Sequence, residues 1–431
     1  MTRIGIRRED KSRWERRTPL VPEDVKRLVE NEGLEFVVQT SPIRVFPDDT
    51  YRAGGAAVAD HLTGCPLILG IKEIPPALLE AGKTYVYFSH TIKGQAQNMP
   101  ALRRLMELGC QLIDYERILD AQGRRLVLFG PYAGQAGMID TLWALGQRLR
   151  HEGLETPFAR VQPAHRYADL AHAKREITQV GESIRQDGLP PSLRPLICGL
   201  SGYGAVSKGA QAIYDCLPVE EVVPEELASL PAADHVCYKV VFKEEHMVER
   251  VDRSAPFQLQ EYYDHPERYR PRFFPNVEYL TLLMNCIFWT PKYPRLVTRE
   301  QLRRLYSKKT RPRLRVIGDV SCDLEGAIEC NVRTTTPDAP VYVYEPATGQ
   351  TRDGVAGDGP VILAIDFLPC ELPLDSSYFF SRVLSPWVPA LARADFSGLL
   401  ADSGLPPELQ RATILYRGEL TEPYRYLSQM I

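Results

Sequence analysis

The sequence predicts an α/β protein built from two doubly wound parallel sheets that follow one another along the chain. Three observations predict this. Short apolar segments alternate with helical segments up to residue 114, and a second series of this kind begins at residue 196. Between the two series, residues 134–150 form one long helical segment that small residues open. Strands that alternate with helices at this spacing pair in parallel and are covered by helices on both faces.

The first series begins with the strand-like segment 2–7. Residues 21–29 follow with helical spacing, and a proline with two acidic residues in the first turn is typical of a helix start. The further strand-like segments are 36–38, 66–72, 85–88 and 111–114, and the further helix-like segments are 78–81 and 98–108. Nearly continuous apolar strands are typical of a parallel sheet that is buried on both faces.

The second series has strands at 196–199, 239–242 and 314–318, and the segment from residue 374 onwards is helical. We expect this last segment to return to the first domain. The predicted domains are residues 1–132 plus 372–431 for substrate and catalysis, a linking helix over 133–152, and residues 153–371 for a dinucleotide. We expect the active site in the cleft between the two domains.

Composition excludes several classes of partner. The chain has 431 residues and a formal net charge of -3, which does not favour nucleic acid or an anionic membrane. Apolar residues make up 44% and charged residues 25%, the ordinary mixture of a globular protein. The uncharged apolar run 279–291 is shorter than the ~20 residues that a membrane-spanning helix needs. We therefore expect a soluble protein without a nucleic-acid or membrane partner.

The cysteines and the N-terminus point to the cytoplasm. The chain has 9 Cys, none in a CxxC pair, so we expect reduced thiols, no disulfide framework and no metal site. The first ten residues are rich in arginine and acids and contain no apolar run, which predicts no secretory signal and no transit peptide.

Residues 196–213 have the order of a dinucleotide-binding turn: an apolar strand, a glycine-rich turn and a helix. Gly202 allows the tight turn, Gly204 lets the backbone approach a pyrophosphate, and the helix N-terminus offers N–H groups. Ser207 stands where the common pattern has a third glycine, and an ordinary strand-to-helix turn is the alternative interpretation. The predicted cofactor contacts are Gly199, Ser201, Gly202, Tyr203, Gly204, Ala205 and Val206.

The next strand predicts the cofactor. In a dinucleotide fold, a carboxylate about 20 residues further on binds the free ribose 2′-hydroxyl. Here the strand 219–223 ends at Val223, which favours NADP(H), whereas a register shift of two would bring in Glu221 or Glu225 and favour NAD(H).

Two consecutive predicted strands end at a lysine and a histidine. Lys72 follows the strand 67–71 and His90 follows the strand 85–89, so both should lie at one carboxyl edge of the sheet, where open α/β folds bind ligands. A desolvated lysine and a histidine can share proton transfer near neutral pH. A solvated loop position is the alternative for each residue alone, but Glu73 and Lys93 nearby favour the functional interpretation.

Paired arginines also follow strand-like segments. Arg16 and Arg17 come after the first strand, and Arg124 and Arg125 precede the segment 126–129. Guanidinium groups at such positions could grip carboxylates, although exposed arginine pairs more often face solvent. Glu116, after the strand 111–114, is similarly ambiguous.

Several strings of residues together resemble a known family. The strings are 7–20 (RREDKSRWERRTPL), 68–72 (ILGIK), 88–93 (FSHTIK), 112–116 (LIDYE), 206–213 (VSKGAQAI), 264–269 (DHPERY) and 318–329 (GDVSCDLEGAIE). They resemble the lysine-ketoglutarate reductase half of the bifunctional aminoadipic semialdehyde synthase. More distantly, they are similar to the lysine-forming saccharopine dehydrogenases and to the alanine dehydrogenase and transhydrogenase N-terminal fold. The resemblance runs from about residue 3 to about residue 395.

The resemblance implies a reductase that joins L-lysine and 2-oxoglutarate into saccharopine with a reduced nicotinamide cofactor, on two Rossmann-like domains. By motif, it implies Lys72 and His90 as the acid/base pair. It implies substrate contacts at Glu15, Arg17, Glu73, Lys93, Glu116 and Arg125, and positions near the cofactor cleft for Asp319 and Asp323. At position 73 the chain departs from the reductase half, and its acid, Glu73, is similar to the lysine-forming dehydrogenases. The choice between NADP(H) and NAD(H) therefore stays open.

Two alternatives remain at this point. One is an NAD-dependent saccharopine dehydrogenase that releases L-lysine, and the other is a dinucleotide-binding sensor without catalysis. The length leaves no room for the second enzyme of the bifunctional relative, so we expect a separate saccharopine dehydrogenase to be the candidate pathway partner. A homo-oligomer also stays open.

Overall fold

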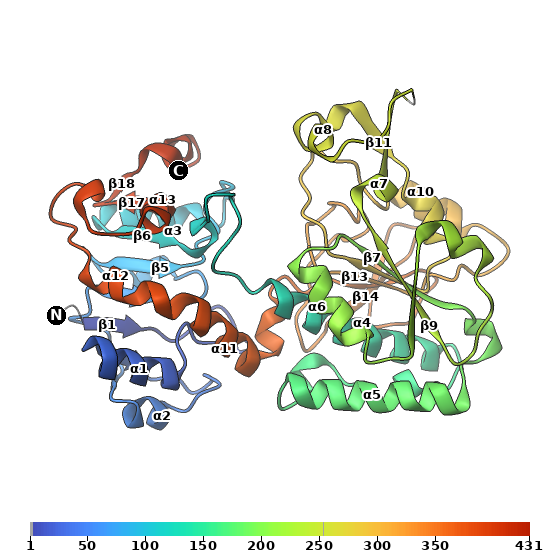
Figure 1. The fold of residues 1–431 in the computed structure, drawn as a ribbon, viewed down its shortest axis with the longest axis horizontal. Helices are drawn as coiled ribbons and strands as arrows, with labels where there is room; N and C mark the ends of the chain where they lie inside the picture. Colours follow the sequence, from blue (N-terminus) through green and yellow to red (C-terminus); the bar gives the residue numbers. More distant parts are fainter. Residues whose placement is uncertain (1–2, 253) are drawn as a thin grey trace. The chain divides into compact units, whose positions relative to one another are not determined.

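The computed structural model describes residues 3–252 and 254–431, which divide into two compact units. The first unit runs up to Phe129 and takes up the chain again at Pro373–Ile431, and the second is Gly130–Leu372. Each unit has its own eight-stranded sheet, six strands of it parallel (Figure 1). The predicted fold class, two doubly wound α/β sheets, is confirmed.

The first sheet has the strand order β18-β17-β6-β5-β4-β1-β2-β3. Its strands are β1 (Arg3–Ile6), β2 (Glu35–Gln39), β3 (Ala57–Ala59), β4 (Leu67–Leu69), β5 (Thr84–Tyr87), β6 (Gln111–Asp114), β17 (Thr413–Tyr416) and β18 (Glu419–Leu420). Its helices are α1 (Pro22–Glu32), α2 (Asp48–Ala53), α3 (Met99–Glu107), α11 (Pro373–Leu384), α12 (Val388–Arg393) and α13 (Pro407–Ala412). The antiparallel hairpin β17–β18 extends the sheet beside β6 and was missed by the sequence pattern, which predicted only helices after residue 374.

Helix α11 returns to the first unit and packs beside α1 (Figure 1). The hydroxyl of Ser381 accepts the Val21 N–H at 3.0 Å and donates to the carboxylate of Asp24. Helix α1 itself begins with Pro22 and two acids, as predicted, and Gly33 ends it at φ 64°, where glycine is favoured. The C-terminal segment is therefore part of the framework that carries the N-terminal strands.

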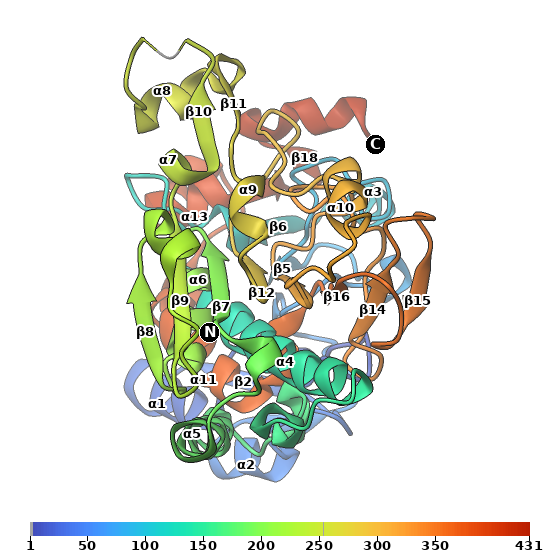
Figure 2. The same cartoon turned by 90° about the vertical axis from the view of Figure 1, so that its right-hand side faces the viewer.

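The second sheet has the order β15-β14-β16-β13-β12-β7-β9-β8. Its strands are β7 (Leu196–Ser201), β8 (Val219–Val222), β9 (Cys237–Phe242), β12 (Leu282–Asn285), β13 (Val316–Asp319), β14 (Val341–Tyr344), β15 (Thr351–Asp353) and β16 (Val361–Leu363). The helices of this unit are α4 (Gly130–His151), α5 (Leu170–Asp187), α6 (Ala205–Tyr214), α7 (Glu244–Met247), α8 (Leu259–Asp264), α9 (Phe274–Val277) and α10 (Arg299–Tyr306). A small ribbon of β10 (Val248–Arg250) and β11 (Tyr269–Pro271) projects with α8 beyond the sheet (Figure 2).

Helices α4 and α6 pack against each other so closely that two glycines are required. A Cβ on Gly134 would lie 1.8 Å from the carbonyl oxygen of Val206, and one on Gly209 would lie 2.0 Å from that of Pro131. Since no side chain fits at those distances, these glycines determine how closely α6, the helix that follows the glycine-rich turn, packs against α4. Within residues 3–252 and 254–431, no helix is both long and apolar enough to cross a membrane.

Candidate active site

The carboxyl ends of four neighbouring strands carry six of the residues that the sequence predicted in the first unit, together with Glu9 and Asp114. Parallel strands β1, β4, β5 and β6 lie side by side, so the residues that follow them meet at one edge. We call this the first-sheet edge; it comprises Glu9, Glu15, Arg17, Lys72, Glu73, His90, Asp114 and Glu116.

Lys72 is the buried amine of the first-sheet edge, with 9% of its surface exposed. Burial lowers the pKa of Lys72, and the positive charges of Lys11 and Arg17 lower it further, against the opposite pull of Glu73 and Glu15. A lysine whose pKa is lowered in this way holds a larger share of neutral amine near pH 7, the form that can accept a proton.

His90 and Glu73 form a hydrogen-bonded pair next to Lys72. Nδ1 of His90 lies 2.5 Å from Oε1 of Glu73, and the imidazole stacks on the ring of Phe88. Burial would raise the pKa of Glu73, but the hydrogen bond and charge of His90 lower it below its usual range. Because Glu73 stays ionised, Nδ1 must carry the hydrogen, which leaves Nε2 to exchange a proton with a ligand.

The backbone of His90 is also held in an uncommon conformation. Its φ of 50° lies in the left-handed region, and Nδ2 of Asn98 donates to its carbonyl oxygen at 2.9 Å. Strained residues of this kind gather at functional sites, where the surrounding structure holds them.

Arg17 and Glu15 make a two-pronged, almost fully buried ion pair. Nε of Arg17 donates to Oε1 of Glu15 at 2.7 Å and Nη2 donates to Oε2 at 2.5 Å. The guanidinium also lies 4.3 Å from the ring centre of Phe129. With one edge bound to Glu15 and one face against Phe129, the guanidinium of Arg17 is held in a fixed position.

Glu9 was not singled out from the sequence, yet it holds the backbone at Lys72. Its carboxylate accepts the N–H of Ile71 at 2.7 Å and that of Lys72 at 2.9 Å. Burial raises the pKa of Glu9 to about 7. The only local signal was an acid three residues past a buried strand, and the charged residues on both sides, Arg8 and Asp10, are typical of a solvated segment.

Asp114, the last residue of β6, is a second functional candidate that the sequence pattern did not single out. It is fully buried and accepts the Ser89 N–H at 3.0 Å and the Glu116 N–H at 2.7 Å. Burial raises its pKa to about 6. Asp114 thus ties the segment of His90 to that of Glu116, which in turn pairs with the exposed Arg125 at 2.9 Å.

The remaining predicted residues of this unit are more exposed. Lys93 lies on the exposed loop after His90, and Arg124 pairs with Asp120 at 2.6 Å. Arg16 faces outward and donates to the carbonyl of Ile43 at 3.2 Å. Of the four arginines in these pairs, Arg17 is therefore buried at the first-sheet edge, whereas its neighbour Arg16 contacts the loop at Ile43.

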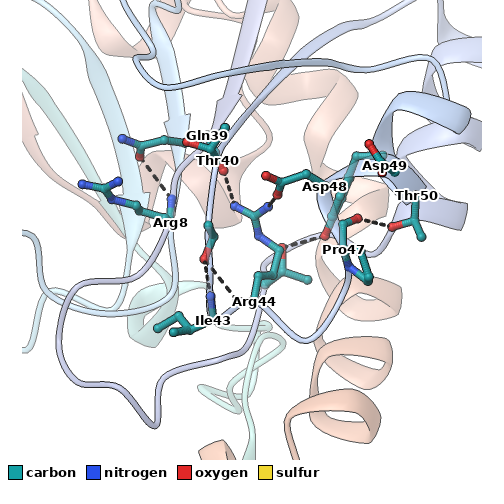
Figure 3. Close-up of polar contacts among 12 residues, drawn as sticks. Arg8, Gln39, Thr40, Ile43, Arg44, Pro47, Asp48, Asp49 and Thr50 are labelled. Carbon is teal, nitrogen blue, oxygen red and sulfur yellow. Dashed lines mark hydrogen bonds and ion pairs between the residues drawn. The ribbon is translucent and has the colours of Figure 1, made fainter.

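The loop that meets Arg16 is organised by Arg44 (Figure 3). The Arg44 guanidinium donates to Asp48 at 2.8 Å and to the carbonyl of Gln39 at 2.5 Å. The N–H of Val45 in the same loop donates to the Arg16 carbonyl at 2.9 Å. This loop after β2 therefore braces the segment that carries Glu15 and Arg17.

In the second unit the glycine-rich turn is built as the sequence predicted. Strand β7 ends at Ser201, Gly202 takes a φ of 86°, and Gly204 caps α6 with open space where a Cβ would stand. Ser207 is fully buried, and the close helix packing that a third glycine would allow is supplied by Gly209. Free N–H groups at the start of α6 suit a pyrophosphate.

Two predicted cofactor residues are engaged within the sheet. Ser201 donates to Oδ1 of Asn285 at 3.0 Å, and Asp319 accepts Nδ2 of Asn285 and of Asn331, each at 2.8 Å. Burial raises the pKa of Asp319 to about 6. This network joins the carboxyl ends of β7, β12 and β13. Burial raises the pKa of the Cys322 thiol, and the negative charge of Asp319 raises it further.

A tyrosine-lined cavity of 440 Å³ adjoins the turn and was missed by the sequence pattern. Gly202, Tyr203 and Gly204 form one wall, and residues of α7, of α8 and of the segment after β12 form the others. The signal for it was present as a tyrosine-rich segment, 262–293, but that segment is distant in sequence from the turn. Among residues 3–252 and 254–431, no group of three His, Cys, Asp or Glu side chains is arranged to hold a metal ion.

Comparison with known proteins agrees with this architecture. The family model "Alanine dehydrogenase/PNT, N-terminal domain" matches residues 5–136. An L-alanine dehydrogenase structure covers 100% of this chain and 99% of its own at a TM-score of 0.63 and 17% identity. A transhydrogenase from Sinorhizobium meliloti covers 97% of this chain and 100% of its own at a TM-score of 0.54 and 15% identity. At such identities the likeness establishes the fold alone.

Sequence relatives are more informative. The alpha-aminoadipic semialdehyde synthase of Arabidopsis thaliana is 38% identical over 99% of this chain and 41% of its own length. The mitochondrial enzyme of that name from Mus musculus is 34% identical over 99% of this chain and 48% of its own. The NAD(+), L-lysine-forming saccharopine dehydrogenase of Emericella nidulans is 29% identical over 89% and 90%. The chain thus spans about half the length of the semialdehyde synthases, and the predicted resemblance to them is confirmed.

Proposed function

We propose that this chain is a lysine-ketoglutarate reductase. Along 99% of its length it is homologous to a part of the alpha-aminoadipic semialdehyde synthases. The reaction joins L-lysine to 2-oxoglutarate and reduces the resulting imine to saccharopine. The observation that carries the proposal is the buried Lys72, with its lowered pKa, beside the His90–Glu73 pair.

The first step requires a base. The side-chain amine of free lysine has a pKa near ~10.4, so it is protonated near neutral pH and must lose a proton before it attacks the keto carbon. Lys72 supplies that base, because burial and the charges of Lys11 and Arg17 favour its neutral form. The proton can then pass to Nε2 of His90, whose other nitrogen is fixed by Glu73.

The second step requires an acid. Attack gives a carbinolamine, whose hydroxyl must leave as water to form the imine, and a proton delivered to that oxygen assists the departure. His90 can return the proton from Nε2 while Glu73 stabilises the imidazolium through Nδ1. A nicotinamide cofactor, when bound, supplies the hydride that reduces the imine.

Both substrates also carry carboxylates, which need positively charged partners. Lysine and 2-oxoglutarate bring three carboxylates in all. The candidate cations for them are Arg17, which is already paired with Glu15 at 2.5 Å, and the lysines Lys11 and Lys93. Arg125, paired with Glu116 on its exposed side, is the further candidate for a carboxylate.

The second unit would hold the cofactor at Gly202, Gly204 and the start of α6, and the residues fit a dinucleotide, since nothing blocks the backbone at Gly204. The strand 219–223, whose end at Val223 favours NADPH, is β8 of the structure and lies at the edge of the sheet, with β9 between it and β7.

The test is to follow absorbance of NADH and of NADPH at their common maximum with L-lysine and 2-oxoglutarate together. We expect oxidation that requires both substrates, and mass spectrometry of the product should show saccharopine. Mixtures that omit either substrate, or replace lysine by ornithine, are the controls. If neither NADH nor NADPH is oxidised in the presence of both substrates, the proposal is overturned.

A second candidate is a saccharopine dehydrogenase that releases lysine and uses NAD. It is favoured by Glu73 and by the fungal relative, of which this chain covers 90%. Turnover that is faster from saccharopine and NAD than from lysine and 2-oxoglutarate at neutral pH would select it. Cofactor binding without turnover in either direction would instead select a sensor. The relatives from mammals are mitochondrial by name, so the cytoplasm is proposed here only from the sequence.

A further inference from the structure

The first unit contains a cavity of 430 Å³ that takes no part in the reaction proposed above. Residues at the carboxyl ends of β1, β2 and β3 line it together with residues of the short helical turn Pro76–Leu78. None of the eight residues of the first-sheet edge lines it. Its volume lies in the range of roughly 300–1,000 Å³ that small-molecule sites have. We call it the Arg7 cavity; its lining includes Arg7, Arg8, Asp60, Ile74, Leu78 and Tyr85.

Arg7 brings an unused hydrogen-bond donor to this cavity. Its side chain is only 5% exposed, and its Nη2 donates to the carboxylate of Asp10. Its Nη1 is buried and finds no acceptor within the part of the chain that the structure describes. A buried charged donor without an acceptor is costly, so a ligand that supplies one is favoured. A guanidinium that is already held at one end is a good partner for a carboxylate.

Two further donors line the same cavity. The hydroxyl of Tyr85 accepts the Glu80 N–H at 2.8 Å, which leaves its own hydrogen for a ligand. Nε of Arg8 lies 3.3 Å from Oδ1 of Asp10, the carboxylate that also pairs with Arg7. Two arginines that share one acid leave one positive charge for a ligand carboxylate.

The cavity carries a negative charge as well. Oδ1 of Asp60, just after β3, accepts the Thr40 hydroxyl at 2.7 Å, and an ionised carboxylate can accept several further donors. Gln39 joins this segment to that of Arg8. Its Oε1 accepts the Arg8 N–H at 3.2 Å, as Figure 3 shows, and its Nε2 donates to the Asp60 carbonyl at 3.1 Å. The segments that carry a cation and an anion are therefore fixed next to each other.

Much of the remaining lining is apolar. Ile74 and Leu79 are buried, whereas Leu78 is 51% exposed. An apolar group bound in the cavity would cover Leu78 and remove this surface from water. Glu80, a further acid of the lining, is already paired with Lys83 at 2.7 Å. The lining therefore offers a donor for a carboxylate, an acid for a cation and an apolar surface.

We infer that the Arg7 cavity binds a free α-amino acid with an apolar side chain. The ligand carboxylate meets the unpaired donor of Arg7, the ammonium group meets Asp60, and the side chain covers Leu78. A simple carboxylic acid leaves Asp60 without a counterion, and a simple amine leaves Arg7 without an acceptor, so the ligand needs both charges. The inference concerns the first unit alone and does not depend on the reaction proposed above.

The test measures binding of L-leucine to the full chain by calorimetry, in the absence of substrates. We expect saturable binding with a dissociation constant of about 1 mM or tighter, which is ordinary for a ligand of this size. 4-Methylpentanoate lacks the ammonium group and 3-methylbutylamine lacks the carboxylate, so each should bind at least about 10-fold more weakly. Absence of saturable leucine binding at about 10 mM, or equal binding of either analogue, would overturn the inference.

Surface variants then place the ligand in the cavity. Ala77→Trp fills the cavity from the exposed turn and should abolish leucine binding, whereas Ala121→Trp, at an exposed position outside the cavity, should not change it. Asp60→Asn should weaken leucine binding at least about 10-fold and leave 4-methylpentanoate binding as it is. Asp49→Asn removes an exposed acid outside the cavity and is the matched control. Unchanged leucine binding in Ala77→Trp or in Asp60→Asn would overturn the inference.

Two variants separate this cavity from the first-sheet edge. Arg7→Lys keeps the positive charge but loses the planar fork, so leucine should bind about 10-fold more weakly while circular dichroism stays that of the wild type. Lys72→Met alters the first-sheet edge and should leave leucine binding unchanged. Loss of leucine binding in Lys72→Met but not in Ala77→Trp would place leucine at the first-sheet edge and overturn the inference. Leucine binding without lysine-dependent oxidation would leave the inference standing and overturn the proposed reductase instead.

Discussion

The carboxyl edges of the two sheets solve different problems with different residues. At the first-sheet edge, buried charges lie against one another: Lys72 among four charged groups, and His90 held by Glu73. At the edge of β7 and β9, a backbone turn and tyrosines surround one carboxylate, Glu244. The first arrangement shifts pKa values and suits proton transfer, while the second leaves space and hydrogen-bonding groups and suits holding a ligand. The same sheet architecture thus separates chemistry from binding.

The sharpest test of this division is Lys72→Met. Methionine keeps the length and apolar packing of the side chain but cannot accept a proton, so we expect turnover to fall about 1000-fold, the scale of a lost acid/base group. The dissociation constant for NADH should be unchanged, because the cofactor turn lies in the other unit. Steady-state kinetics and calorimetry give the two readings.

The exposed Lys26, which pairs with Glu30 at 3.8 Å, provides the matched control Lys26→Met. It should leave both turnover and binding as they are. Loss of NADH binding together with turnover in Lys72→Met would show that Lys72 is structural and would remove the division between the edges.

The reverse test alters the second unit. In Gly209→Ala the added Cβ would lie 2.0 Å from the Pro131 carbonyl, so α6 must move away from α4. We expect a loss of about 3 kcal/mol in the stability of this unit, the upper range for overpacking a close contact, and weaker NADH binding. Thermal unfolding followed by circular dichroism measures the first effect.

Gly204→Ala is the comparison for that variant, because its Cβ would meet open space and its φ is -75°. Its melting temperature should be unchanged, while NADH binding should weaken since the Cβ stands where the backbone must approach a pyrophosphate. Equal melting temperatures for the two variants would contradict the packing argument.

A buried acid pair in the second unit predicts the pH dependence of its stability. Oδ1 of Asp140 accepts the Ala164 N–H at 2.7 Å, and Oε2 of Glu371 accepts Nδ1 of His165 at 3.0 Å. The other oxygens, Oδ2 and Oε1, are buried without a donor, so the pair is satisfied when it shares a proton. Burial raises the pKa of Glu371 to about 7 and that of Asp140 well above its usual range.

Because the folded pair keeps a proton that the unfolded carboxyls release above about pH 4, stability falls as the pH rises from there through 7. In Asp140→Asn the side-chain amide provides a hydrogen-bond donor for Glu371 at every pH. We expect its melting temperature to change less than that of the wild type between pH 6 and pH 8, and its stability at pH 8 to be about 2 kcal/mol higher. The exposed Asp187→Asn should follow the wild type; parallel curves for all three proteins would contradict the shared proton.

The comparison of the edges also shows what sequence reasoning could reach. Lys72, His90 and the turn at Gly202 each follow a recognisable strand, so local pattern was enough to place them. Glu9 and Asp114 were missed because their roles depend on contacts 62 and 25 residues away in the chain. Glu244 was missed because it lies about 40 residues along the chain from the glycine-rich turn, and only the folded structure brings it to the cavity beside that turn.

Glu9→Gln tests the smallest of these effects, the placing of Lys72 by its backbone. A glutamine amide can accept one of the two N–H groups of Ile71 and Lys72 but presents its own hydrogens to the other, so one bond is lost. We expect kcat/KM to fall about 10-fold, the scale of one lost hydrogen bond to a charged group, with NADH binding unchanged. The pH profile distinguishes positioning from general damage. Since the pKa of Glu9 is about 7, wild-type activity should gain from its ionisation as the pH rises through neutrality, and the Gln variant should lack that part of the rise. A uniform loss at every pH would show that Glu9 supports the fold of the edge but does not tune the position of Lys72.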